Sequence, residues 1–274
     1  YHGRKGGLVA AFAGRVQHNA VGGKALFGQL RGSLTGIGTE KACILHPNTP
    51  GQLRMAWALA YQLLGYPARF PKYIALSFDD GPNTVTTPKV LDVLEENGVA
   101  ASFFVCGKNI DKSTARVMRR AVQLGCDIEN HSFSHSHISR LTEEQIREEI
   151  SRTDQLIEKW TGTAPRFFRP PYIDHNELMH KVIDLTFIQG IGADDWKAEV
   201  DAATREKLIL DNVKDGDIIL LHDFEGNDAT VEALKKVIPE LKRRGFEFVT
   251  VPQLFDQVRG HAPEAHNGKI YTNV

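Results

Sequence analysis

The chain has few cysteines and almost no net charge. Three cysteines, Cys43, Cys106 and Cys126, are an odd count without a C-x-x-C pair, so neither a disulfide framework nor a zinc knuckle is indicated. The 33 basic and 34 acidic residues leave a formal charge of -1, with no basic block. Nothing in this composition therefore points to a nucleic acid partner or to an anionic membrane surface.

Long hydrophobic runs are also missing. No apolar stretch approaches the roughly 20 residues that cross a bilayer, so no transmembrane segment is predicted. Residues Leu8 to Gly14 follow Arg4 and Lys5 as in a signal peptide, but the apolar run is short and no small-residue cleavage site follows it. We predict no signal peptide here, and the residues alone leave the compartment and the oligomeric state open.

The 274 residues, 42% of them hydrophobic, suffice for one catalytic domain of α/β type. Residues 1–70 are glycine-rich and contain an amphipathic stretch, Gln52 to Leu64, so we expect a partly helical N-terminal appendage, whose role the sequence leaves open. From Tyr73 onward, strand-like and helix-like segments alternate, which indicates parallel β/α units over residues 71–258. Residues 259–274 are polar and are expected to form an irregular tail.

Two adjacent carboxylates, Asp79 and Asp80, follow an apolar stretch typical of a buried strand, and Gly81-Pro82 turns the chain after them. Successive strand residues point to opposite faces, so both carboxylates reach one site only where the backbone turns. Carboxylates at this end of a strand suit the active site of an α/β barrel. The alternative is that one of them caps a helix beginning near Thr84.

Two histidines four residues apart, His131 and His135, have the spacing of paired zinc ligands if the segment between them is helical or tightly turned. With one carboxylate they give three protein ligands and leave a position for water, as in a hydrolytic metal site. The alternative is a polar loop with two ordinary histidines. The pair follows the strand-like stretch Cys126 to Glu129, so it also lies at a strand end.

Three further polar clusters follow predicted strands: Arg169-Pro170-Pro171-Tyr172, Asp194-Asp195-Trp196 and His222-Asp223. The two prolines fix the backbone, so that the amide of Tyr172 is held toward a site. Taken alone, His222 is more simply interpreted as a satisfied core histidine. Five polar clusters at the ends of successive strands instead indicate one shared site.

The ordered set S-F-D-D-G-P, H-S-F-S-H, R-P-P-Y, D-D-W and I-L-L-H closely resembles the five motifs of the NodB-like polysaccharide deacetylases, carbohydrate esterase family 4. The resemblance covers roughly residues 72 to 256. It implies a distorted (β/α) barrel of about seven strands. It also implies a divalent metal ion and the removal of N- or O-linked acetyl groups from sugars.

Carried over by position, the resemblance implies that Asp80, His131 and His135 bind one divalent metal ion, zinc in most members, with cobalt or nickel as alternatives. Asp79 would be the general base. Arg169 would pair with Asp79 and hold it in place.

The resemblance also implies that the amide of Tyr172 and the metal stabilise the oxyanion and that His222 protonates the leaving group. Asp195 would pair with His222 and raise its pKa. Trp196, Tyr172 and Leu220 would offer apolar surface to the substrate, although core packing is the simpler interpretation of Leu220.

Two positions depart from the family pattern: Gly192 stands where an aspartate is common, and Ile173 stands where glycine often follows R-P-P-Y. We expect an acetylated carbohydrate substrate, with N-acetylated glycans such as chitooligosaccharides or peptidoglycan favoured, and a secreted or cell-envelope location. The alternatives are an O-acetyl esterase on xylan, a non-catalytic carbohydrate-binding protein and a metal-dependent amidohydrolase acting on small cyclic amides.

Overall fold

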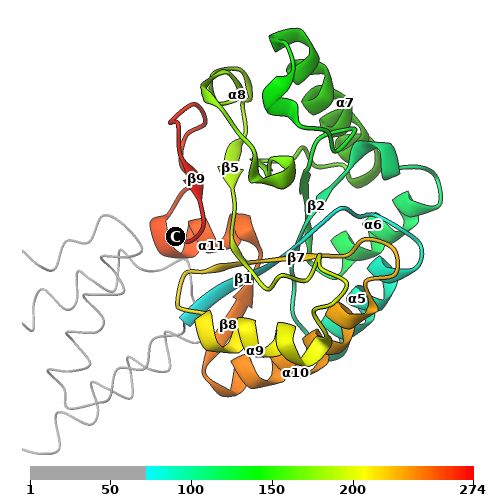
Figure 1. Cartoon of the computed structure of the whole chain (residues 1–274), viewed down its shortest axis with the longest axis vertical. Helices are drawn as coiled ribbons and strands as arrows, with labels where there is room; N and C mark the ends of the chain where they lie inside the picture. Colours follow the sequence, from blue (N-terminus) through cyan, green and yellow to red (C-terminus); the bar gives the residue numbers. More distant parts are fainter. Residues whose placement is uncertain (1–71) are drawn as a thin grey trace, which may run out of the picture. The chain divides into compact units, whose positions relative to one another are not determined.

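Strand β1 (Lys72–Asp79) is central to the sheet in the computed structural model, which describes residues 72–274 (Figure 1). Its C-terminal half pairs with β2 and β7, and its N-terminal half pairs with β8. The sheet order is β6-β7-β1-β2-β3-β4-β5-β9, and all its ladders are parallel. The other strands are β2 (Ser102–Val105), β3 (Asp127–Asn130), β4 (Phe167–Phe168), β5 (Thr186–Ile188), β6 (Ile191–Gly192), β7 (Ile218–His222), β8 (Phe246–Val249) and β9 (Ile270–Tyr271).

The sheet has to curl, because its strands β5 and β6 are far apart in the sheet order but only two residues apart in the chain. The C-terminal segment then links β5 to the start of β7. Gln189 N–H donates to the carbonyl of Tyr271, and Ile218 N–H donates to the carbonyl of Thr272. Parallel strands that curl in this way bring their C-terminal ends to one rim of a barrel.

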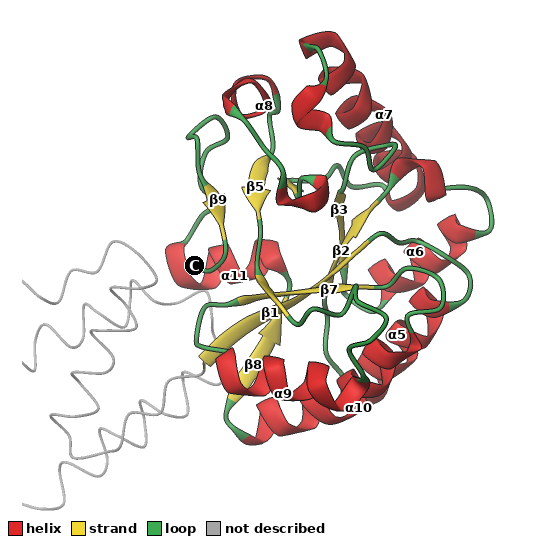
Figure 2. Cartoon of the chain, viewed as in Figure 1, coloured by secondary structure: helices red, strands yellow, loops and turns green. Residues whose placement is uncertain are grey.

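Helices surround the curled sheet, as the crossovers between parallel strands require (Figure 2). They pack against one another in the series α9, α10, α5, α6, α7 and α8. None of the helices described is both long and apolar enough to span a bilayer. Their bounds are α5 (Thr86–Asn97), α6 (Thr114–Gln123), α7 (Glu143–Thr161), α8 (Glu177–Val182), α9 (Ala202–Asn212), α10 (Asp228–Arg243) and α11 (Val251–Arg259).

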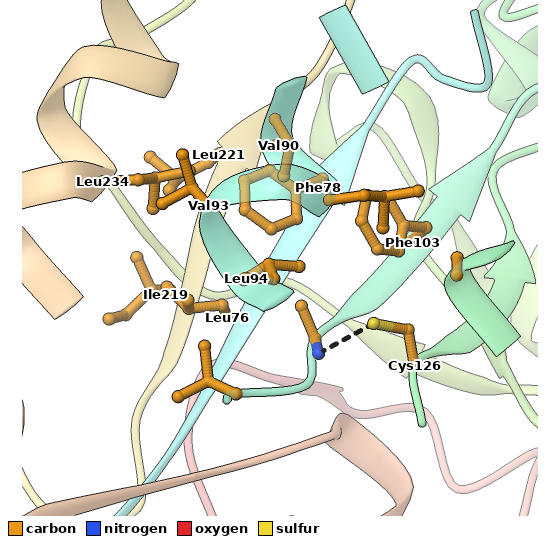
Figure 3. Close-up of a cluster of buried hydrophobic side chains, with 14 of the residues drawn as sticks. Leu76, Phe78, Val90, Val93, Leu94, Phe103, Cys126, Ile219, Leu221 and Leu234 are labelled. Atoms are coloured by element: carbon orange, nitrogen blue, oxygen red, sulfur yellow. Dashed lines mark hydrogen bonds between the residues drawn. The ribbon is translucent and has the colours of Figure 1, made fainter. Parts of the chain in front are cut away.

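The main hydrophobic core lies between β1, β2 and β7 and the helices that cover them (Figure 3). Alternate residues of β1, including Leu76 and Phe78, point into this core and are fully buried. The ring of Phe78 stacks on that of Phe103, with centroids 5.2 Å apart. Replacing such a buried phenylalanine by alanine typically costs about 3–5 kcal/mol. The core residues therefore fix β1 in one register, with Ser77 and Asp79 on the opposite, inner face.

Several local predictions need correction. The tail from 259 to 274 is not wholly irregular, because it contains β9 and extends the sheet. Together with the splitting of one predicted strand into β5 and β6, this gives nine strands among the described residues instead of about seven. The missed strands are two residues long, too short for a period-2 pattern to develop. The predicted helix from Gln52 to Leu64 lies outside the described residues.

Candidate active site and metal centre

Asp79 and Asp80 end strand β1 and reach the same rim of the barrel. Asp79 continues the inner face of the strand, whereas Asp80 has a φ of 74°, a left-handed conformation that breaks the alternation. Neither carboxylate caps the following helix. The Asn83 side chain instead accepts hydrogen bonds from the amides of Val85, Thr86 and Thr87. The capping alternative for the two aspartates is therefore wrong.

Asp80, His131 and His135 form a cluster whose ligand atoms lie within 4.8 Å of one another. Asp80 Oδ1 is 3.0 Å from His135 Nε2 and 3.5 Å from His131 Nε2. Burial by itself raises the pKa of Asp80, but the close approach of the two imidazoles outweighs burial and holds that pKa well below its ordinary value. Asp80 Oδ1 is buried without a well-formed hydrogen bond. An oxygen in that situation beside two imidazoles fits a divalent cation.

The segment between the two histidines is a tight loop, not a helix. His131 Nδ1 lies 2.6 Å from the carbonyl oxygen of Arg169, a contact that requires a proton on Nδ1 and leaves Nε2 with its lone pair toward Asp80. Glu149 of α7 accepts hydrogen bonds from the amides of Phe133 and Ser134 at 3.0 and 2.8 Å. The loop is thus anchored from both sides, and its two histidines are preorganised.

Arg169 pairs with Asp79, as the sequence predicted. Arg169 Nη1 is 2.6 Å from Asp79 Oδ1, and Nη2 donates to the Ser77 hydroxyl at 2.8 Å. Arg169 is fully buried and lies over the ring of Phe104, with 4.1 Å between the guanidinium carbon and the ring centroid. Burial lowers the pKa of Arg169, and Asp79 opposes that effect. The buried pair holds Asp79 in one orientation, 3.8 Å from His131 Nε2.

His222 ends β7 opposite Asp79 in the β1–β7 ladder. Its Nδ1 is 2.8 Å from Asp195 Oδ1, and its backbone amide donates to Asp195 Oδ2 at 2.8 Å. Asp195 is buried and also accepts a hydrogen bond from the Thr230 hydroxyl. Burial lowers the pKa of His222, but the hydrogen bond and charge of Asp195, with help from Asp79 and Asp80, raise it to about 9. His222 is therefore held as an imidazolium at neutral pH.

Tyr172 and Trp196 are the two most exposed large apolar side chains among residues 72–274, at 59% and 61%. Tyr172 follows β4 and Trp196 follows β6, so they leave the barrel at the same rim as the carboxylates. Leu220 lies on the inner face of β7, partly buried, with its Cβ against Gly190. Leu220 belongs to none of the three hydrophobic clusters of the described residues, so its contribution to an apolar substrate surface stays a prediction.

Left-handed backbone is concentrated at this rim. Among non-glycine residues with positive φ are Asp80, His135, Tyr172, Ile173 and Asp194. Such conformations cost about 1–3 kcal/mol each and persist where surrounding contacts hold them, which is common at functional sites.

The sequence reasoning assigned no role to two groups that support these residues. Glu149 lies on α7 and carries no motif signal beyond its place on a polar helix face. Asp223 follows His222, and its buried carboxyl accepts a hydrogen bond from Thr87 at 2.5 Å and packs directly against Gly81. Burial raises the pKa of Asp223 to about 7. Its adjacency to His222 was the available signal.

Comparison with known proteins agrees with this geometry. The sequence profile of the family described as polysaccharide deacetylase matches residues 68–189. A bifunctional xylanase/deacetylase from Pseudobutyrivibrio xylanivorans is 45% identical over 203 residues, which cover 74% of this chain and 33% of that protein. A peptidoglycan-N-acetylglucosamine deacetylase from Bacillus cereus is 38% identical over 188 residues, or 66% of this chain and 68% of that protein.

Among solved structures, a family 4 acetyl xylan esterase from Clostridium thermocellum in complex with a cobalt ion superposes with a TM-score of 0.72. It is 41% identical, and the match covers 74% of this chain and 99% of that one. The match thus spans a complete esterase domain but only about a third of the bifunctional relative.

Proposed function

Because this chain belongs to the polysaccharide deacetylase family, we propose that it is a metal-dependent hydrolase that removes acetyl groups from an acetylated glycan. The single observation that carries the proposal is the convergence of three groups at one rim. These are the cluster around Asp80, the buried Asp79–Arg169 pair and the His222–Asp195 pair. Together they provide metal ligands, a base and an acid within one site.

Asp80, His131 and His135 would hold one divalent ion, zinc in our proposal, which would supply a Lewis acid that polarises the acetyl carbonyl and lowers the pKa of water. The donor set of two imidazoles and one carboxylate suits zinc and also cobalt or nickel. The cobalt ion in the Clostridium thermocellum structure supports a site tolerant of several divalent ions.

Proton movement would depend on this chain's own side chains. Asp79, oriented by Arg169, which Ser77 in turn holds, would accept the proton of the attacking water. The amide N–H of Tyr172 would donate a hydrogen bond to the oxyanion. His222, kept protonated by Asp195, would give its proton to the departing amine or alkoxide. Opposite charges on Asp79 and His222 are the pattern expected of a base and an acid acting in one reaction.

The protonated His222 favours an N-acetylated glycan, because an amine leaves poorly unless it is protonated, whereas an alkoxide from an ester leaves more readily. Chitooligosaccharides and peptidoglycan are therefore the first substrates to test. O-acetylated xylan is the second candidate, because the relatives whose names mention xylan share 45% and 41% identity with this chain, against 38% for the peptidoglycan deacetylase. These polymers are extracellular or in the cell wall, so we expect action there.

The deciding experiment measures acetate release from chitooligosaccharides, peptidoglycan fragments and acetylated xylan, each before and after chelation and after adding back zinc. Activity that chelation abolishes and zinc restores would support the metal-dependent hydrolase. Mass spectrometry should show a loss of about 42 mass units for each acetyl group removed. Binding of the glycans without acetate release would instead support the non-catalytic carbohydrate-binding alternative.

A further inference from the structure

The exposed ring of Tyr172 is held by two histidines, the proposed metal ligand His135 and His137, which has no part in the proposed chemistry. His137 stacks on it with ring centroids 4.2 Å apart and an interplanar angle of 20°. The His135 ring meets it at a steep angle with centroids 4.8 Å apart. The Tyr172 hydroxyl donates a long hydrogen bond of 3.4 Å to the carbonyl of His135. The tyrosine ring thus contacts two imidazole rings, yet 59% of the residue stays open to solvent.

The backbone beneath the ring needs this support. Tyr172 and Ile173 have φ values of 60° and 55°, and a β-branched residue such as Ile173 is disfavoured in the left-handed region. The glycine common after R-P-P-Y in the family would adopt this conformation at little cost. In this chain, contacts made by the next residue have to hold the segment.

Asp174 makes those contacts. Its Oδ2 accepts hydrogen bonds from His137 Nδ1 at 3.0 Å and from the Ser139 hydroxyl at 2.6 Å. The side chain of Asn176 adds a hydrogen bond to the carbonyl of Ser139 at 2.7 Å. These bonds fasten the loop after β4 to the loop after β3. They fix the imidazole plane of His137, and the imidazole in turn fixes the ring of Tyr172.

We propose that Asp174 and His137 form a brace that presents Tyr172 as a stacking surface for a sugar unit adjoining the acetylated one, so that the brace sets the preference for oligomeric over small substrates. This inference rests on the proposed function and adds positioning residues that act through Tyr172. A hydrogen-bonded pair that served only to stabilise the fold would be better protected from water if it were buried. The side chains of His137 and Asp174 are instead 42% and 36% exposed, beside the open ring of Tyr172. An exposed, preordered ring loses little conformational entropy when a pyranose ring packs on it.

The test compares three variants with wild type on N-acetylglucosamine and xylose oligomers of increasing length and on 4-nitrophenyl acetate. His137→Ala removes both the stacking contact with Tyr172 and the hydrogen bond to Asp174. His137→Phe keeps an aromatic ring but lacks Nδ1. Asp174→Asn weakens the hydrogen bond with His137 and changes the shape of the side chain little. His261→Ala, at an exposed histidine of the C-terminal segment, is the control. Metal content and the midpoint of thermal unfolding are recorded for each protein, because His137 follows the proposed metal ligand His135 closely in the chain.

We expect His137→Ala to raise KM for the oligomer that wild type cleaves best by about 2- to 10-fold, the range of one aromatic contact. The kcat for that oligomer should change by a smaller factor than its KM. The rate of 4-nitrophenyl acetate hydrolysis should likewise change by a smaller factor. Asp174→Asn should show a smaller rise of the same kind, and His137→Phe should recover most of the oligomer affinity. Calorimetric titration with the deacetylated oligomer should show the same order of affinities.

Equal losses on the oligomer and on 4-nitrophenyl acetate would overturn the brace, because they would indicate general damage to the catalytic site. An unchanged oligomer KM in both His137→Ala and Asp174→Asn would also overturn it. If wild type releases no acetate from any glycan, the proposed function fails and the brace fails with it. An active wild type with unaffected variants refutes the brace alone.

Discussion

Replacing Asp195 by asparagine removes the charge that faces His222 while keeping the size of the side chain. In the wild-type protein the pKa of His222 is about 9, against an ordinary value of 6.5. That difference corresponds to about 3 kcal/mol in favour of the imidazolium. Burial opposes protonation, so without Asp195 only the more distant Asp79 and Asp80 support the charge. We expect the pKa of His222 in Asp195→Asn to fall by at least about one unit.

The sign of the effect on rate and on stability follows from the raised pKa. An acid catalyst must be protonated, so kcat/KM for an amide substrate should decline as pH rises through the pKa of His222. In Asp195→Asn this decline should begin at lower pH. The contribution of the pair to folding stability is complete below the unfolded pKa of about 6.5 and is lost as pH rises through about 9. The variant should therefore lose stability at neutral pH and lose little further on alkalinisation.

The assay follows acetate release from the preferred glycan between about pH 5 and 10, where both limbs of a bell-shaped profile are visible. The proposed metal ligands are the same in both proteins, so the charge of a bound ion would affect both profiles alike. Asp194→Asn is the matched control, because Asp194 is the neighbouring, exposed carboxylate and pairs with Lys197 at 3.0 Å. An alkaline limb in Asp195→Asn that coincides with wild type would refute the assignment of the acid to His222.

Three further outcomes are expected. Asp79→Asn should reduce acetate release on the order of 10²-fold or more, since it removes a positioned base, while elemental analysis finds the metal retained; near-normal turnover would exclude Asp79 as the base. His131→Ala combined with His135→Ala should abolish the binding of about one divalent ion per chain, and full retention of that ion would contradict the assigned ligands. Arg169→Met should lower the free energy of unfolding by about 3–5 kcal/mol in urea titrations, because it leaves Asp79 buried without its partner. The double change with Asp79→Asn should recover part of that loss, and an unaltered midpoint for Arg169→Met would show that the buried pair does not stabilise the fold.

The sequence identified the residues of the site through local signals. Each motif combined polar side chains with the end of an apolar strand, and both properties are visible within about ten residues of chain. Because the C-terminal ends of parallel strands meet at one rim, the sequence also predicted that Asp80, His131 and His222 come together. The sequence also predicted a turn at the end of this strand from Gly81-Pro82, whereas the left-handed backbone at Asp80 is visible only in the structure.

Contacts across the rim were decided by the tertiary structure. The hydrogen bonds that Glu149 accepts from the histidine loop and that Asp174 accepts from His137 join residues whose types and spacing carry no signal of their own. Strand β9 depends on the neighbouring β5 to supply hydrogen-bonding partners, because two residues cannot specify a strand by themselves. Local sequence thus indicated which side chains the proposed chemistry would use. Strand order and register, fixed by packing of the whole core, decided which side chains hold them in place.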